Sequence, residues 1–140
     1  MSFDWLEYFD IAQELVTQAK NNSPHQEANL RVAISRAYYA VFNKARDHLR
    51  RHDKIREPSP LVDSNGNHIN IHAYVREKFK NSADADYREI GLALERMVKD
   101  RNAADYDLTN IVFNKPLFTT QANLIWAKDA LQRLKRLQKS

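Results

Sequence analysis

Apolar residues recur at spacings of three and four along most of the chain, which is the period of an amphipathic α-helix. The spacing predicts a first helix over about residues 2–21, with Trp5, Phe9, Ala12, Val16 and Ala19 on its apolar face. A longer stripe follows, formed by Leu30, Ala33, Ile34, Ala37, Tyr38, Val41, Phe42, Ala45 and Leu49. Ser23 as N-cap, Pro24 at the first helical position and Gln26 in a capping box predict where this second helix starts. A stripe of about five turns makes it the expected central helix.

The helical pattern stops between residues 52 and 70, where Pro58, Pro60 and the turn-forming run 63–67 predict one long loop. A short helix is expected over about 71–81, anchored by Val75 and Phe79. Residues 82–86 offer caps for a fourth helix with the apolar face Ile90, Ala93, Leu94, Met97 and Val98. Its spacing falters after Arg101, and Pro116 marks a further break. The last helix is expected to start near Thr119 and to carry Leu124, Ala127, Leu131 and Leu134.

These elements predict an all-α fold, an antiparallel up-down bundle of four main helices plus one short extra helix. A chain of 140 residues has the length of one domain, taken as 1–140. With 2 glycines and 4 prolines it has too few turn formers for a many-stranded sandwich or barrel. The best strand candidate, 110–113, is short.

The composition narrows the cellular setting. Cysteine is absent, which excludes disulfides, Cys-ligated zinc, iron–sulfur clusters and thiol catalysis. No apolar run approaches the roughly 20 residues of a membrane span, and the N-terminal residues lack the basic-then-apolar order of a secretory signal. We therefore expect a cytoplasmic protein with no membrane partner. Lys and Arg exceed Asp and Glu by 22 to 18, a modest excess that is compatible with a polyanionic partner.

Several familiar site motifs are missing from the chain: a Gly-rich phosphate loop, a Gly-x-Ser-x-Gly elbow, His-Glu-x-x-His and an Asp-rich calcium loop. His68 and His72 have helical spacing, but His68 lies in turn-like sequence, so neither a metal site nor a cofactor is predicted. Basic residues gather at the end of the second helix and in the loop: Lys44, Arg46, Arg50, Arg51, Lys54 and Arg56. This run is either a solvated face or a surface that steers a polyanion.

The most informative stretch is 101–106. Arg101 continues the apolar stripe of the fourth helix, and a guanidinium that faces a core needs a carboxylate, an anion or a cleft. On a continuing helix, Asn102, Asp105 and Tyr106 share less than half of the circumference with it. One interpretation is structural, with Arg101 paired to Asp105 while Tyr106 caps the core. The other is an anion site, in which Arg101 forks onto a phosphate while Asn102 and Tyr106 donate hydrogen bonds.

A second polar group, Arg36, Tyr39 and Asn43, lies on the second helix away from its apolar stripe. Such residues are most simply explained as a packed tyrosine beside a solvated arginine. The alternative is a second polar wall that faces the Arg101 stretch.

These stretches together resemble the HEPN superfamily (higher eukaryote and prokaryote nucleotide-binding domains), in particular its small stand-alone, toxin-like branch. The carriers are Ser35-Arg36-Ala37-Tyr38-Tyr39-Ala40-Val41-Phe42, then His72-x-x-Val75-x-x-x-Phe79, then Arg101-x-x-Ala104-Asp105-Tyr106. The resemblance spans about residues 5–135. It implies an all-α bundle that forms a homodimer, with the Arg motifs of both protomers facing one cleft. Many members are metal-independent endoribonucleases, often toxins paired with a nucleotidyltransferase antitoxin, and others bind nucleotides or act as scaffolds.

The nuclease members of this family carry an Arg that is followed, after four to six residues, by a His. Arg101 matches the first position, but Tyr106 stands in the place of the histidine. A phenol with a pKa near 10 is ionised to only about one part in a thousand at pH 7, so Tyr106 is a poor base. If the chain is an endoribonuclease, Arg101 would stabilise a phosphate attacked by the adjacent 2′-hydroxyl and Asn102 would help to orient it. Asp105, Tyr106 or His72 would then handle the protons.

The alternative function is a non-catalytic dimeric module that binds RNA or a nucleotide and acts with a nucleotidyltransferase partner. Arg101 keeps its role in this hypothesis, and only the proton-transfer group separates the two. Arg36, Tyr39 and His72 are the further residues expected to contact RNA or nucleotide.

Overall fold

The computed structural model describes residues 3–21, 25–106 and 115–139, which form helices and, within these ranges, no strand. The α-helices are α1 (Leu6–Lys20), α2 (Gln26–Asp47), α3 (Ile71–Lys80), α4 (Ala85–Tyr106) and α5 (Pro116–Lys139). A π-helix, η1 (His48–His52), continues α2 directly. The all-α class predicted from the sequence is confirmed.

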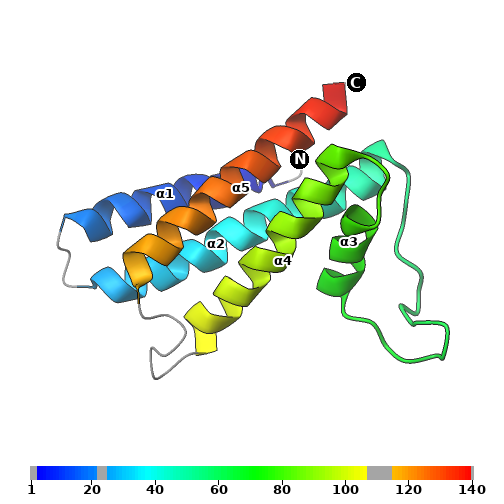
Figure 1. Cartoon of the computed structure of the whole chain (residues 1–140), viewed down its shortest axis with the longest axis horizontal. Coiled ribbons are helices and arrows are strands. Elements are labelled where there is room, and N and C mark those ends of the chain that lie inside the picture. Colours follow the sequence, from blue (N-terminus) through cyan, green and yellow to red (C-terminus); the bar gives the residue numbers. More distant parts are fainter. Residues whose placement is uncertain (1–2, 22–24, 107–114, 140) are drawn as a thin grey trace.

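Helix α2 lies at the centre of the fold and contacts α1, α3, α4 and α5. In Figure 1, α1 and α2 lie side by side and run in opposite directions, while α4 and α5 cross in front of α2. Every residue of the predicted α2 stripe is buried, from Leu30 to Leu49. The long α2 stripe therefore marks the central helix, as the sequence predicts. The antiparallel bundle of four main helices stays a prediction.

Several helix boundaries differ from the predicted ones. Helix α1 begins at Leu6 rather than near residue 2, and the Asp4 carboxylate accepts a hydrogen bond from the Leu6 amide at 3.0 Å. Helix α4 continues through the region where the apolar spacing falters, and it ends at Tyr106. Helix α5 begins at Pro116 instead of near Thr119, because proline suits the first turn of a helix, where its missing N–H is not needed. The predicted cap at residues 23 and 24 and the strand candidate 110–113 lie outside the described residues.

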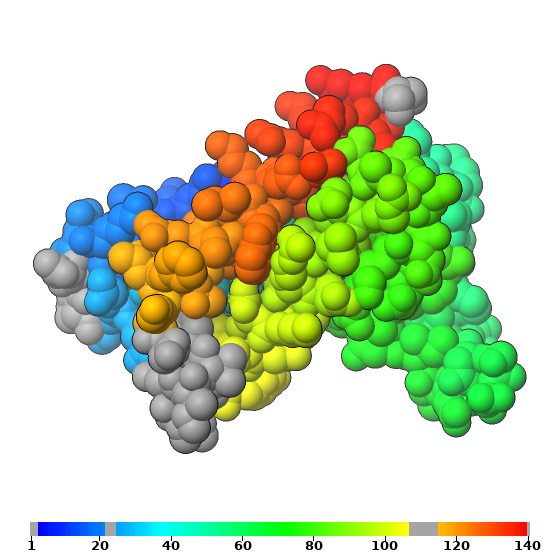
Figure 2. Space-filling view, in the orientation of Figure 1, coloured from blue at the N-terminus to red at the C-terminus, as the bar shows by residue number. Residues whose placement is uncertain are grey.

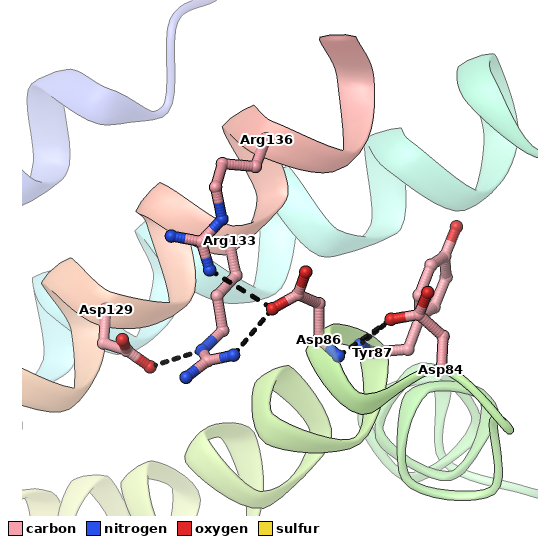
Figure 3. Close-up of polar contacts among 6 residues, drawn as sticks. All are labelled: Asp84, Asp86, Tyr87, Asp129, Arg133 and Arg136. Carbon is pink, nitrogen blue, oxygen red and sulfur yellow. Dashed lines mark hydrogen bonds and ion pairs between the residues drawn. The ribbon is translucent and has the colours of Figure 1, made fainter. Parts of the chain in front are cut away.

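Two local features hold α4 in place against α3. The Asp84 carboxylate precedes α4 and accepts hydrogen bonds from the amides of Asp86 and Tyr87, at 2.8 and 3.3 Å (Figure 3). This confirms the capping predicted for 82–86. A Cβ atom on Gly91 would lie 2.5 Å from the backbone nitrogen of Lys80, so only glycine lets the end of α3 approach α4 this closely. Helix α3 is thereby fixed beside α4.

The loop between η1 and α3 extends from one end of the molecule together with α3, as the green region of Figure 2 shows. It carries one isolated antiparallel bridge, between Val62 and His68. Glu57 ties the loop back to the body, because its carboxylate accepts hydrogen bonds from Arg46 and Arg50. These two arginines, the Arg50 hydrogen bond first, lower the pKa of Glu57 to about 2.

Candidate anion-binding site

Three of the predicted site residues meet where α2, α3 and α4 come together. The Nη1 atom of Arg101 lies 3.4 Å from the hydroxyl of Tyr39, and the guanidinium carbon lies 5.4 Å from the ring centre of Tyr38. His72 reaches the same two tyrosines from α3, with ring centres 5.6 Å from Tyr38 and 6.1 Å from Tyr39. Its ring also stacks on Phe42 at 4.1 Å. We call Arg101, Tyr38, Tyr39, Phe42 and His72 the Arg101 cluster.

The Arg101 side chain turns inward, as the sequence predicts, and is only 16% exposed. Its Nε atom is buried and has no hydrogen-bond partner among the described residues. The predicted ion pair with Asp105 is present but long, at 3.9 Å between Nη1 and Oδ2. Two tyrosine rings stabilise the cation through their faces. A shielded guanidinium normally requires full pairing with carboxylates. Arg101 has one long ion pair and two ring contacts among the described residues, so its charge is only partly compensated.

His72 is placed in the first turn of α3 by the cap of that helix. The side chain of Asn70 accepts a hydrogen bond from the His72 amide at 2.7 Å. The Nδ1 atom of His72 and the hydroxyl of Tyr38 share a hydrogen bond of 2.7 Å. Burial raises the pKa of Tyr38 to about 12, so this hydroxyl stays protonated.

The His72 imidazole is held in its neutral form. Burial lowers the pKa of His72, and the charge of Arg101 lowers it further, with smaller contributions from Arg76 and Arg46. An imidazole with a pKa below about 6.5 is mostly neutral at pH 7 and can accept a proton there. The cluster therefore combines the incompletely paired guanidinium of Arg101 with the neutral imidazole of His72, which can act as a base.

The remaining residues predicted on α4 lie outside the cluster. Asn102, Asp105 and Tyr106 are exposed, and Tyr106 is 72% exposed. The interpretation in which Tyr106 caps the core is therefore wrong, because α4 continues past Arg101 and carries Tyr106 round to the solvent side. Asn102 and Tyr106 do not converge on the guanidinium within this chain.

Arg36 contributes to a neighbouring surface rather than to the cluster. Its guanidinium carbon lies 5.1 Å from the ring centre of Tyr8 on α1. A groove of about 350 Å³ runs between α2 and the end of α4, lined by Ala28, Arg31, Val32, Ser35, Arg36, Ala104 and Asp105. Because Asp105 also pairs with Arg101, this groove borders the Arg101 cluster. We call it the α2–α4 groove.

The α2–α4 groove owes its shape partly to Arg31, which the sequence analysis did not single out. The Nη1 atom of Arg31 donates hydrogen bonds to the carbonyls of Ala103 and Ala104, at 3.2 and 2.7 Å. It thus satisfies carbonyls near the end of α4 and ties that end to α2. Arg31 lies on a polar helix face, where an arginine carries no distinguishing sequence signal.

The basic run after α2 is less available to a polyanion than its sequence suggests. Glu57 pairs with Arg46 and Arg50, and Lys44 lies 3.5 Å from Asp4. Lys44 also lines a hollow of about 570 Å³ between α1 and α5, but its wall includes the acidic Asp4 and Asp10. The run also contains the exposed Arg51, Lys54 and Arg56, and Lys128 and Lys135 line the hollow beside Lys44. Arg51, Lys54 and Arg56 therefore face solvent, whereas Arg101 is shielded among aromatic rings.

Tyr38 and Phe42 belong to the Arg101 cluster, although the sequence analysis placed them in the core stripe and not among the candidate site residues. They are buried there, as predicted, yet the hydroxyl of Tyr38 and the ring of Phe42 also hold His72. A buried tyrosine needs a hydrogen-bond partner for its hydroxyl. The burial predicted for Tyr38 therefore indicated that a polar side chain would lie beside it. The histidine pair is not formed, because His68 is exposed in the loop while His72 turns toward α2.

None of the described helices is sufficiently long and apolar to cross a membrane. No family model, curated protein or solved structure matches this chain.

Proposed function

We propose that the Arg101 cluster binds a phosphate group of RNA or of a nucleotide, and that the chain is a HEPN-like, RNA-directed protein. The observation that carries this proposal is the state of the Arg101 guanidinium. It is shielded from solvent, its buried Nε lacks a partner among the described residues, and its ion pair is 3.9 Å long. A phosphate can accept two parallel N–H donors from an arginine, which is the pairing that Arg101 lacks.

The surroundings of Arg101 support a nucleotide or RNA over a simple anion. The α2–α4 groove adjoins the cluster and, at about 350 Å³, falls within the range of small-ligand sites. Arg36 and Ser35 line this groove and can bind further phosphate or sugar oxygens. The bundle of HEPN proteins is supported by the directions of α1, α2, α4 and α5, which alternate in Figure 1.

Binding is tested by fluorescence anisotropy with a labelled single-stranded RNA and by calorimetry with AMP and ATP. Arg101→Ala should weaken binding by at least about 10-fold, the loss expected for a charge-assisted bidentate contact. Lys99→Ala is the matched control, because it removes an exposed cation from the same helix. Equal losses in the two variants, or a folded wild type that binds none of these ligands, would contradict the proposal.

RNA cleavage is the second candidate function, and the neutral imidazole of His72 favours it. Since Tyr106 is exposed and is a poor base, we assign the proton-accepting role to His72. Arg101 would stabilise the negative charge that develops on the phosphate while a 2′-hydroxyl attacks it. The leaving 5′-oxygen would receive its proton from solvent or from an adjacent group, and the chain's own residues require no metal for these steps.

Cleavage is measured by incubating total RNA and tRNA with the protein in EDTA. The wild type should cleave, whereas Arg101→Ala and His72→Ala should each lose most of the activity. Binding without cleavage by the wild type would favour the non-catalytic module. Cleavage retained by His72→Ala would instead assign the proton transfer to Asp105 or Tyr106.

The homodimer and the nucleotidyltransferase partner come from the HEPN resemblance. The dimer is supported by apolar side chains that a partner could cover, Val32 on α2 and Phe118 and Ile125 on α5, which are 43%, 71% and 68% exposed. Light scattering should give twice the mass of the chain, and a strict monomer would contradict a cleft shared by two protomers. An antitoxin-like nucleotidyltransferase encoded alongside should co-purify with the chain when the two are co-expressed.

A further inference from the structure

A second cluster of chemically reactive side chains lies where α2 passes into η1. His48, His52 and Asp53 each offer one ligand atom, and these atoms all lie within 4.8 Å of one another. The Oδ1 atom of Asp53 is 3.5 Å from Nε2 of His48 and 2.7 Å from Nδ1 of His52. Imidazole nitrogen and carboxylate oxygen are ligands of zinc and related divalent ions. Three such groups converge here without any contact to Arg101 among the described residues.

The π-helical backbone brings these three residues onto one side. The amide of Asp53 donates to the carbonyl of His48 at 3.1 Å, a hydrogen bond that spans five residues. In an α-helix, where the rotation is about 100° per residue, the fifth residue would point well away from the first. The wider π turn returns Asp53 to His48 and leaves the rings of His48 and His52 stacked at 4.5 Å. Single π turns are found often at functional sites.

His48 carries a feature that core packing does not explain. It is 1% exposed, and its Nδ1 atom has no hydrogen-bond partner among the described residues. A buried imidazole with an unpaired nitrogen costs free energy, whereas a leucine or phenylalanine would fill the same space without that cost. Nδ1 is not the proposed ligand atom, so this cost shows only that a polar ring is kept in the core. The other ring nitrogen, Nε2, lies on the side of Tyr87 and Asp53, 2.8 and 3.5 Å from their oxygen atoms.

Tyr87 of α4 supplies the outer contact that orients a metal-binding carboxylate. Its hydroxyl donates to Oδ2 of Asp53 at 2.7 Å, which leaves Oδ1 directed toward the two histidines. The same hydroxyl lies 2.8 Å from Nε2 of His48. Because Tyr87 has one proton and donates it to Asp53, Nε2–H of His48 donates to the hydroxyl oxygen. A metal ion at Nε2 would displace this hydrogen bond and the ring proton would move to Nδ1, while the bond between Tyr87 and Asp53 would remain. Such outer contacts normally fix the ligands of a metal site.

We propose that His48 Nε2, His52 Nδ1 and the Asp53 carboxylate bind a divalent transition-metal ion of the zinc type. Two imidazoles favour zinc, cobalt or nickel over magnesium and calcium, which require mainly oxygen ligands. Three protein ligands leave a further coordination position for water. This site is independent of the Arg101 cluster and of the function proposed for it. The spacing His48-x-x-x-His52-Asp53 is visible in the sequence, but only the π turn aligns Asp53 with both histidines.

The site is tested on tag-free, full-length protein that has been treated with EDTA and then dialysed. Calorimetry with Zn²⁺ should show one ion per chain, and Co²⁺ should give the visible absorption bands of a low-symmetry nitrogen–oxygen site. His52→Ala and Asp53→Asn should each lower the Zn²⁺ affinity by at least about 10-fold, as the loss of a ligand costs no less than the loss of an outer contact. Zn²⁺ should raise the thermal midpoint of the wild type more than that of these variants.

His68→Ala is the matched control, because it removes an exposed histidine that is not part of the cluster. It should leave both the affinity and the Co²⁺ spectrum unchanged. His52 lies at the surface, and Asp53→Asn keeps the size of the side chain, so circular dichroism should find both variants folded. The proposal is overturned if the folded wild type shows no saturable one-to-one binding, or if His52→Ala and Asp53→Asn both bind Zn²⁺ like the wild type.

Discussion

Arg133 and Arg101 are both largely shielded side chains of long helices, yet their surroundings differ. Arg133 of α5 is 25% exposed and donates to two carboxylates, Asp86 at 2.6 Å and Asp129 at 2.8 Å (Figure 3). Arg136 reaches the same Asp86 at 3.2 Å. Arg101 of α4 is 16% exposed, and its ion pair with Asp105 is 3.9 Å long. The guanidinium of Arg101 otherwise meets ring faces and a tyrosine hydroxyl.

The difference separates an arginine that is fully paired within the fold from one for which we propose a ligand. Burial acts to raise the pKa of Asp86, but hydrogen bonds from Arg133 and Arg136 more than offset it and leave this pKa lowered. Asp86, Arg133 and Arg136 are thus paired with one another where α4 meets α5. At the Arg101 cluster the chain leaves charge unmatched, which costs stability and is retained most readily where function requires it. The following variants test this contrast.

The largest effect on stability is expected at the fully paired arginines. Asp86→Asn removes the carboxylate shared by Arg133 and Arg136, and it should lower the free energy of unfolding by about 1.5 kcal/mol. The measurement is urea denaturation followed by circular dichroism. Glu89→Gln neutralises an exposed carboxylate on the same helix and serves as the control. RNA binding should not change in either variant, and a loss of binding in Asp86→Asn would remove the contrast between the two regions.

A smaller loss is expected from the cap that positions His72. Asn70→Ala removes the side chain that accepts the His72 amide and should cost about 1 kcal/mol of stability. Because the first turn of α3 then loosens, ligand affinity at the Arg101 cluster should fall together with stability. Asn81→Ala, at the other end of the same helix, is the comparison variant. An unchanged affinity in a destabilised Asn70→Ala protein would show that His72 does not contribute to the site.

Replacing Arg101 should abolish ligand binding and leave the stability almost unchanged, which is the reverse of the result expected for Asp86→Asn. Arg101→Met keeps an apolar stem over the tyrosine rings and removes an incompletely paired charge, so the free energy of unfolding should stay within about 0.5 kcal/mol or rise. Ligand binding should nevertheless be lost. Denaturation and anisotropy measured on one preparation give both values. A clear loss of stability would mean that Arg101 is a structural residue like Arg133.

The smallest effect is expected in the pH dependence. The folded-state pKa of His72 lies below its unfolded value of about 6.5, so the unfolded chain binds this proton more readily. The stabilisation is complete above about pH 6.5 and is lost as the pH falls through the folded pKa. Between pH 7 and pH 5, the free energy of unfolding of His72→Phe should therefore fall less than that of the wild type. Every other histidine is present in both proteins, so the difference between the two reports on His72 alone.

The charge of Arg101 can be read from the same histidine. Because Arg101 lowers the pKa of His72, Arg101→Gln should raise that pKa in an NMR titration of the imidazole. Lys99→Gln removes a charge from an exposed position of the same helix and should leave the pKa unchanged. A His72 pKa that responds equally to both variants would show that Arg101 has no special proximity to the ring.

Local periodicity explains which parts of the fold and site could be predicted. The buried stripe of α2 and the inward direction of Arg101 both follow from helical spacing, which neighbouring residues set by themselves. The helix ends were less predictable, since α4 persists to Tyr106 although its apolar pattern weakens. Packing of one face against the rest of the fold can sustain a helix beyond its strongest pattern.

The amino-acid sequence by itself determined that this protein is helical, that one arginine faces inward, and which face of α1, α2, α3 and α4 is buried. The face predicted for α5 was wrong in part, because Asn123 and Ala130 are buried there while Leu124 and Leu131 are only half-buried. Only the tertiary structure decided that His72 and Tyr38 meet beside Arg101, that Arg36 lies over Tyr8 instead, and that a π turn aligns His48 with Asp53. The physical reason is the range of the interactions. Periodicity acts between residues within a few positions, whereas the contacts of His72 and Arg36 depend on how α1, α3 and α4 pack around α2. The π turn is local, but a regular period of 3.6 residues does not predict it.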